Sequence, residues 1–268
     1  MSNAAIKLSS PATREFWEIS VLFEDDHLLA LDKPAGLLTS PDIASPFRPD
    51  LMKLLHDAIA DKKSWARERN LDYLNNAHTL DAEISGVILL AKNKTVFVAL
   101  SNLFSSGKVA EKYIALVRGE PLENKFEVDA KIAPHPVTPG LMRVDSKDGK
   151  QAKTKFGVLE NFPRFGYALL KCEPLTNRPH QIRVHASHVN LKIVGDELYG
   201  GKFLWLSRLK KDYRLKPGRE ERPLISRAAL HSEELQFPHP VTNETVTIKS
   251  EWPKDLKVAL KYLRQFAK

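Results

Sequence analysis

The chain has 268 residues, 43% of them hydrophobic and 28% charged, which is the composition of a globular protein with a sizeable buried core. A run of about 18 apolar residues is absent, so no membrane span is predicted, and we expect no secretory signal. Lysine and arginine number 41 against 33 acidic residues, a formal charge of +8 that favours a polyanionic partner, with nucleic acid first. The single cysteine, Cys172, excludes an internal disulfide, and we expect a packed thiol in a cytoplasmic protein.

Apolar periodicity, caps and breakers predict short strands with a few helices among them. In the first half of the chain they predict, in order, an N-terminal arm over residues 1–17, strands over 19–23 and 27–32, a helix over 51–61 capped by Asp50, an exposed basic segment over 62–76, a buried strand over 86–91 and a helix over 95–105. In the second half they predict a strand over 109–117, further strands over 126–172 with a hairpin turn at Asp148-Gly149, a helix over 176–189 with Pro179 in its first turn, a charged surface segment over 207–221, strands over 228–237 and 245–250, and a helix over 253–266.

Hairpins outnumber regular strand–helix alternations in this order of elements. They predict an α+β fold with a mixed, largely antiparallel sheet and flanking helices. We expect residues 18–268 to form one catalytic domain behind the arm.

A carboxylate precedes the buried strand in the segment His78-Thr79-Leu80-Asp81-Ala82-Glu83-Ile84-Ser85-Gly86. A loop carboxylate on a rigid scaffold is a common active-site arrangement. Spacing alone favours the simpler alternative, in which Asp81 is a turn or capping residue.

The same segment resembles the signature of the RluA-type pseudouridine synthases, His-Arg-Leu-Asp-x-x-Thr-Ser-Gly before an apolar strand, and Asp81 falls on the catalytic aspartate of that family. Further segments resemble the family's other motifs in order and spacing: 21–37, 112–119, 149–154, 178–185, 193–200 and 230–240. Several ordered motifs are far more specific than one, and the chain is identified as a member of the family. The resemblance implies the pseudouridine synthase type of fold and isomerisation of uridine in structured ribosomal or transfer RNA. It also implies that no cofactor and no metal are needed.

The resemblance also implies roles for individual residues. An ionised Asp81 would attack the anomeric carbon of the sugar or remove a sugar proton. Arg183 would pair with it and lower its pKa, and Tyr113 would lie near the base. Residues expected to contact RNA are His78, Thr79, Arg178, His180 and Gln181, with Arg67 and Arg69 in a basic rim that also includes Lys62, Lys63, Lys210, Lys211 and Arg214.

Three positions depart from the family pattern: Thr79 replaces an arginine, Ala82 a basic residue and Ile84 a threonine. The family arginine is linked to holding the target nucleotide out of the base stack, and a threonine can neither intercalate nor pair with phosphate. Thr79 and Ile84 favour an alternative function, an RNA-binding or RNA-folding protein with little catalysis. The retained Asp81, Tyr113 and Arg183 argue against it.

Two other site types are weaker hypotheses. A carboxylate glycosidase would need a second acid, for which Glu83 is the only nearby candidate. The spacing of His185 and His188, with His180 close by, could place imidazoles on one helical face, but we expect no metal there. We also expect a monomer without an S4-like RNA-binding module.

Overall fold

The structure of the protein, a computed structural model, describes residues 5–42, 46–215 and 218–266. The strand pairs whose register is defined run antiparallel, and helices pack beside them, which confirms the predicted α+β class. Within the described ranges, helices are too short or too polar to cross a bilayer.

The chain divides into two compact units. Unit 1 comprises Met1–Glu111 and Ser232–Glu251, and unit 2 comprises Lys112–His231 and Trp252–Lys268. The chain passes between them three times, within β7 (Ala110–Arg118), within β14 (Leu230–Pro238) and between Glu251 and Trp252.

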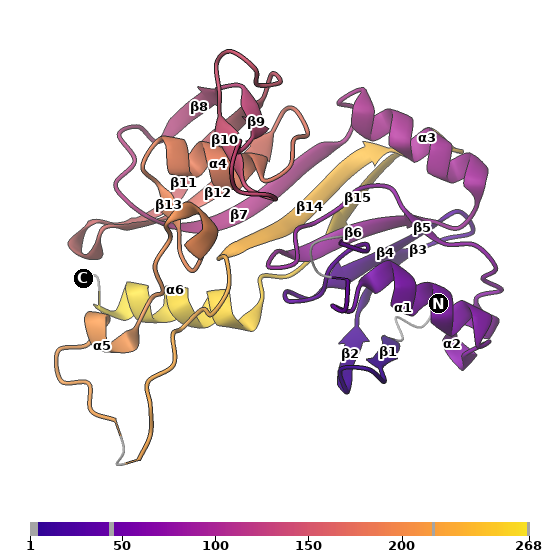
Figure 1. Ribbon diagram of the computed structural model, residues 1–268, viewed down its shortest axis with the longest axis horizontal. Coiled ribbons are helices and arrows are strands. Elements are labelled where there is room, and N and C mark those ends of the chain that lie inside the picture. The colour runs from indigo at the N-terminus through magenta and orange to yellow at the C-terminus, as the bar shows by residue number, and fades with distance from the viewer. Residues whose placement is uncertain (1–4, 43–45, 216–217, 267–268) are drawn as a thin grey trace. The chain divides into compact units, whose positions relative to one another are not determined.

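Unit 1 is built on a sheet with the strand order β3-β4-β6-β14, in which β5 also pairs with β6 and β15 with β14 (Figure 1). Its elements in chain order are β1 (Ile6–Ser10), β2 (Glu15–Ile19), β3 (Val21–Glu24), β4 (Leu28–Lys33), α1 (Leu51–Ala60), α2 (Ser64–Glu68), β5 (Asn75–Asn76), β6 (Ser85–Ala91), α3 (Lys94–Ser105), most of β14, and β15 (Thr245–Lys249). Strands β1 and β2 form a separate hairpin.

Both faces of this sheet are covered, because successive side chains of a strand point to opposite sides. On one face, Leu29, Leu31, Ile88 and Leu90 pack with α1, α2 and the β1–β2 hairpin. On the other face, Leu28, Ala30, Val87 and Leu89 pack with α3. Strand β6, buried along its whole length, is therefore a rigid support for the loop that precedes it.

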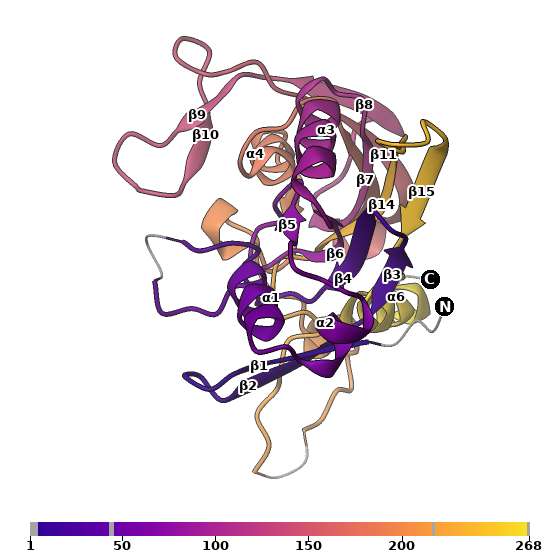
Figure 2. The ribbon, with the colours of Figure 1, turned by 90° about the vertical axis from the view of Figure 1, so that its right-hand side faces the viewer.

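Unit 2 contains a second set of strands in the order β7-β12-β11-β8, with β13 paired to β7. Its further elements in chain order are β8 (Lys125–Asp129), β9 (Ile132–Pro134), β10 (Met142–Val144), β11 (Lys153–Phe162), η1 (Pro163–Phe165), β12 (Tyr167–Pro174), α4 (Gln181–His188), β13 (Lys192–Ile193), η2 (Glu197–Tyr199), α5 (Leu206–Leu209) and α6 (Lys254–Phe266). The β9–β10 hairpin lies beside α4 (Figure 2).

The strongly periodic elements are confirmed, namely β3, β4, α1, β6, α3, β7, β14, β15 and α6. The predicted cap is also present, since a carboxylate oxygen of Asp50 accepts a hydrogen bond from the amide of Lys53 at 2.8 Å. Asn93 caps α3 in the same way through the amide of Val96 at 2.9 Å.

Two N-terminal expectations are wrong at the level of secondary structure. Within the predicted arm, whose residues 1–4 lie outside the described ranges, β1 and β2 form a hairpin with Ile6 and Leu8 in the core. The segment 62–76 contains α2, which buries Trp65 and Ala66. Both segments are short, so their apolar patterns are weak alone, and they gain stability by packing in the core of unit 1 against α1 and the sheet. The predicted boundary between an arm and a catalytic domain at residue 18 stays a prediction.

Two predictions in unit 2, a hairpin turn and the start of a helix, are also wrong. Asp148-Gly149 does not join paired strands, because β10 pairs with β9 while β11 pairs with β8 and β12. A side chain at Gly149 would lie 2.3 Å from the carbonyl oxygen of Asp145, so close backbone approach requires this glycine. Helix α4 begins at Gln181 rather than 176, because His180 has a left-handed backbone with φ of 54°.

The segment 207–221, of which residues 216–217 are outside the described ranges, is mostly exposed, although Leu209 at the end of α5 is buried.

Candidate active site

Asp81 lies in unit 1, in the loop before β6. Its neighbours Leu80, Ala82 and Ile84 are buried, whereas Asp81 is half-buried and Thr79 is exposed. The amide of Ile84 donates to the carbonyl of Asp81 at 3.1 Å and closes a tight turn. Buried neighbours thus fix the backbone, while the carboxylate remains partly accessible to solvent, as a residue that meets a substrate requires.

The segment 36–39 holds this loop from one side. The amide of Gly36 donates to the carbonyl of Ala82 at 2.7 Å. The hydroxyl of Thr39 donates to the carbonyl of Leu80 at 2.7 Å and accepts from its amide at 3.1 Å. The residues on both sides of Asp81 are therefore bonded to one neighbouring segment, which restricts the position of the carboxylate.

A buried lysine adds to this support. Lys33 is 0% exposed, and its ammonium donates to the carbonyls of Leu37 at 2.6 Å, Pro34 at 3.0 Å and Ala82 at 3.4 Å. Backbone carbonyls thereby solvate a buried positive charge and draw the turn at Pro34 towards the Asp81 loop.

His78 lies inside unit 1, 6% exposed, rather than on a surface open to RNA. Its Nε2 accepts from the amide of Leu89 at 3.1 Å, and its ring stacks on Phe104 with centroids 4.7 Å apart. Burial lowers the pKa of His78 to about 3, so the ring is neutral. His78 therefore ties the Asp81 loop to β6 and α3.

The glycine of the Ser85-Gly86 pair is required by its surroundings. Gly86 has φ of +118°, and a Cβ there would lie 2.1 Å from the carbonyl oxygen of Ser232 in β14. Only a residue without a side chain allows β6 to start beside β14 at this point.

In unit 2, Arg183 forms a buried bidentate ion pair that the sequence alone did not reveal. Its Nε donates to Asp196 at 2.8 Å and its Nη2 at 2.7 Å, with side chains 4% and 1% exposed. The guanidinium also lies over the ring of Tyr199, 5.0 Å from the centroid. The hydroxyl of Tyr199 bonds Nδ1 of His180 at 2.7 Å and accepts from the amide of Met142 at 3.0 Å.

This arrangement fixes the plane of the Arg183 guanidinium and compensates its charge. Asp196 and Tyr199 both lie in the segment 193–200, which resembles a family motif, but the sequence analysis predicted no role for either residue.

Tyr113 is a buried residue of β7, paired across the ladder with Cys172 of β12. Burial raises the pKa of the Cys172 thiol, which fits the expected packed cysteine. The predicted proximity of Tyr113 to the base stays a prediction.

Two other residues near α4 that were predicted to contact RNA form hydrogen bonds within unit 2. The side-chain Nε2 of Gln181 donates to the carbonyl of Lys153 at 2.9 Å and to the hydroxyl of Thr154 at 3.0 Å. Arg178 donates to the carbonyls of Gln151 at 3.1 Å and Asn177 at 2.8 Å. The Gln181 bonds hold α4 against β11, and the Arg178 bonds hold the loop before α4. Structural roles therefore account for Gln181 and for part of Arg178.

His185, considered above with His188 for a metal site, bonds Thr154 through Nδ1 and the carbonyl of Ala130 through Nε2, both at 2.9 Å. Burial also lowers its pKa. His188 is exposed at the end of α4. Both nitrogens of the His185 ring thus serve protein oxygens, which supports a packing role.

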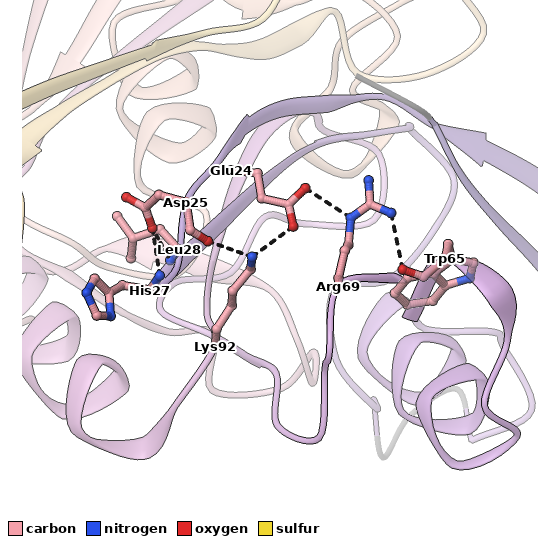
Figure 3. A network of polar contacts seen from close by, with 7 residues as sticks. All are labelled: Glu24, Asp25, His27, Leu28, Trp65, Arg69 and Lys92. Atoms are coloured by element: carbon pink, nitrogen blue, oxygen red, sulfur yellow. Dashed lines mark hydrogen bonds and ion pairs between the residues drawn. The ribbon is translucent and has the colours of Figure 1, made fainter. Parts of the chain in front are cut away.

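The two arginines of the predicted basic rim differ. Arg67 is exposed, whereas Arg69 forms an ion pair with Glu24 at 3.0 Å and donates to the carbonyl of Trp65 at 3.2 Å (Figure 3). Lys92 binds the other oxygen of Glu24 at 2.8 Å. Arg69 therefore helps to join α2 to β3, and Arg67 is the better candidate for an RNA contact.

The predicted site residues fall in both units. Asp81, His78, Thr79, Arg67 and Arg69 belong to unit 1. The members in unit 2 are Tyr113, Arg178, His180, Gln181 and Arg183. The pairing of Asp81 with Arg183 stays a prediction.

Comparisons with known proteins agree with the motifs. The family model described as RNA pseudouridylate synthase matches residues 27–188. The ribosomal large subunit pseudouridine synthase D of Xanthomonas campestris is 36% identical over 250 residues, which cover 92% of this chain and 70% of that protein. The ribosomal large subunit pseudouridine synthase C of Salmonella typhi is 31% identical, with the same two coverages.

A solved structure, human RNA pseudouridylate synthase domain containing 4, shows the same fold, with a TM-score of 0.67 at 23% identity over 91% of this chain and 92% of that one. The family model covers more than half of the chain, and the bacterial relatives are similar over most of it. The chain therefore belongs to the RluA-type family of RNA pseudouridine synthases, isomerases that convert uridine to pseudouridine.

Proposed function

We propose that this enzyme modifies uridine in large-subunit ribosomal RNA, with Asp81 as its catalytic carboxylate. The observation that carries the proposal is the half-buried Asp81 on a loop fixed by Leu80 and Ala82, at the position of the family aspartate. Ribosomal RNA is favoured over transfer RNA because the similar bacterial proteins are named for the large ribosomal subunit.

The reaction breaks the bond between N1 of the base and C1′ of the ribose, turns the base and joins C5 to C1′, after which C5 loses its proton to N1 or solvent. The product is an isomer of the substrate, so the step needs no oxidant or reductant. An ionised Asp81 either attacks C1′ or removes the proton from C2′.

Arg183 and Tyr113 complete the proposed machinery. The guanidinium of Arg183 would favour the ionised form of Asp81. The ion pair with Asp196 and the contact with Tyr199 support a positioned, fully charged Arg183. Tyr113 would relay the C5 proton, passing its own hydroxyl proton to N1 or solvent, or it would pack against the turning base.

The alternative of an RNA-folding protein without catalysis is not favoured, because the relatives are named as synthases. We further propose a monomeric, metal-free enzyme of the cytoplasm. Light scattering of the purified protein and elemental analysis test the first two properties, and fractionation of the source cells tests the third.

Replacement of Asp81 by Asn tests the proposal. The variant keeps the size of the side chain but loses the charge, and we expect pseudouridine formation to fall by a factor of about 10³ or more. Unmodified transcripts of large-subunit ribosomal RNA and transfer RNA are incubated with protein, and pseudouridine is mapped by selective chemical labelling.

The matched control is Asp57→Asn, which removes an exposed carboxylate of α1 paired with Lys53. It should modify the same uridines as the unaltered enzyme. Equal activity of Asp81→Asn and Asp57→Asn would show that Asp81 is not the catalytic carboxylate. Modification of transfer RNA alone would show that ribosomal RNA is not the substrate.

A further inference from the structure

Phe47 and Arg48 form an exposed pair in unit 1, just before α1. Phe47 is 92% exposed, more than the other exposed large apolar side chains of the described part of unit 1, among which Phe16 is 61% exposed. A single exposed apolar residue is ordinary. The distinctive feature is that an aromatic ring and a guanidinium, the two groups that bind unstacked nucleotides, stand together here.

The backbone places this pair next to the catalytic loop. Nη2 of Arg48 donates to the carbonyl of Gly36 at 3.0 Å. The amide of the same Gly36 donates to Ala82, the neighbour of Asp81, at 2.7 Å. One peptide segment thus connects Arg48 on one side with the Asp81 loop on the other.

Other bonds hold the same three segments together. The amides of Leu51 and Met52 donate to the carbonyls of Leu38 at 2.8 Å and Thr39 at 3.1 Å. Thr39 in turn bonds Leu80 through its hydroxyl. The Arg48 guanidinium and the backbone on both sides of Asp81 therefore bond the same short segment, 36–39.

We propose that Phe47 and Arg48 contact the substrate RNA beside the extruded uridine and replace the family arginine that is Thr79 in this chain. The Arg48 guanidinium would bind a phosphate next to the target nucleotide. The Phe47 ring would stack on a base exposed when the uridine leaves the helix. The inference rests on the proposed function, because it assumes that the target uridine reaches Asp81.

Other arginines near the loop fit this role less well. Arg69 is held by Glu24 and by the carbonyl of Trp65. Arg67 is exposed but lies on α2, which within the described ranges forms no hydrogen bond to segment 36–39. Arg48 combines exposure with a direct bond to the segment that supports Asp81.

The test compares Phe47→Ala and Arg48→Ala with Phe16→Ala and Lys7→Ala, which remove an exposed aromatic and an exposed cation from the β1–β2 hairpin of the same unit. The substrate is the RNA fragment around a uridine that the unaltered enzyme modifies. It is made with that uridine paired, and again with it opposite a mismatch.

We expect Phe47→Ala and Arg48→Ala to slow modification of the paired uridine by about tenfold each, and to affect the mismatched one much less, because a mismatched base is easier to extrude. The control variants should leave both rates unchanged. Introducing Thr79→Arg into the Arg48→Ala protein should restore most of the rate on the paired substrate.

Equal losses on both substrates without rescue by Thr79→Arg, or unchanged rates, would overturn the inference. Binding of a uridine-containing RNA hairpin is measured as well, with each variant combined with Asp81→Asn. Weaker binding for the Phe47 and Arg48 combinations than for the controls supports the RNA contact even if the Asp81 assignment fails, and equal binding refutes the contact.

Discussion

Asp81 and Asp196 both lie in segments that resemble motifs of the family, yet their surroundings differ and give them different roles. Asp81 is half-buried on a restrained loop. Asp196 is enclosed and neutralises the buried guanidinium of Arg183. Accessibility distinguishes the residue that can meet substrate from the residue that positions a partner.

Asp196→Asn should destabilise the protein by about 3 kcal/mol or more, because it removes the charge that compensates buried Arg183. Glu160→Gln breaks the exposed pair between Glu160 and Arg264 and should change the free energy of unfolding by less than about 1 kcal/mol. Urea unfolding of the two variants measures the difference. Similar changes in the free energy of unfolding for the two variants would show that Asp196 is not needed to compensate the charge of buried Arg183.

His78 should make stability depend on pH. Its pKa is about 3 in the folded protein and 6.5 in the unfolded chain. Below 6.5 the unfolded chain therefore binds a proton that the folded protein does not, and stability falls as the pH drops from 6.5 towards 3.

At pH 5 we expect His78 to lower the free energy of unfolding by about 2 kcal/mol relative to neutral pH. His78→Gln keeps an acceptor for the amide of Leu89 but cannot titrate. The variant should lose less stability than the unaltered protein when urea unfolding is repeated at pH 7.5 and pH 5. An identical loss in both proteins would assign the pH dependence to other groups.

Among the elements, β6 tolerates polar residues least, because it is buried along its whole length. The loop that precedes it carries Asp81. Its predicted limits, 86–91, differ from the observed Ser85–Ala91 by one residue. A continuous apolar run predicts such a strand since both faces must be covered. The hairpin β1–β2 was missed because its five-residue strands alternate too briefly to distinguish them from an arm.

Gly86→Ala should prevent normal pairing of β6 with β14, because its Cβ would lie 2.1 Å from the carbonyl oxygen of Ser232. We expect loss of several kcal/mol of stability, or no soluble protein. Gly107→Ala is matched in its positive φ of +68° but meets no atom within 4 Å, so about 1 kcal/mol is expected. Thermal unfolding and soluble yield distinguish the two, and equal effects would show that φ rather than the close approach determines the cost.

At the scale of the whole molecule, the charge of +8 favours RNA binding, but individual cations contribute according to their contacts. Arg67 is exposed, whereas Arg69 is paired with Glu24 (Figure 3). Net charge therefore overestimates the number of cations available to phosphate.

Arg67→Ala should weaken RNA binding and reduce the slope of log K against log salt by about 0.7 to 0.9, the release of roughly one counterion. Arg69→Ala should leave the slope unchanged but lower the free energy of unfolding. Binding between about 50 and 200 mM salt, with urea unfolding of both variants, measures these effects. A reduced slope for Arg69→Ala would place that residue on RNA.

The sequence by itself determined the α+β class, the strongly periodic elements, the family and the candidate Asp81, because repeated apolar patterns and ordered motifs are properties of the chain alone. It could not show that His78 is enclosed, that Arg183 is held by Asp196, or that Arg48 is bonded beside the Asp81 loop. These facts depend on burial and on partners that are 11 or more residues away in the chain. Only the tertiary structure decides them, because a side chain's environment is set by which distant segments pack around it.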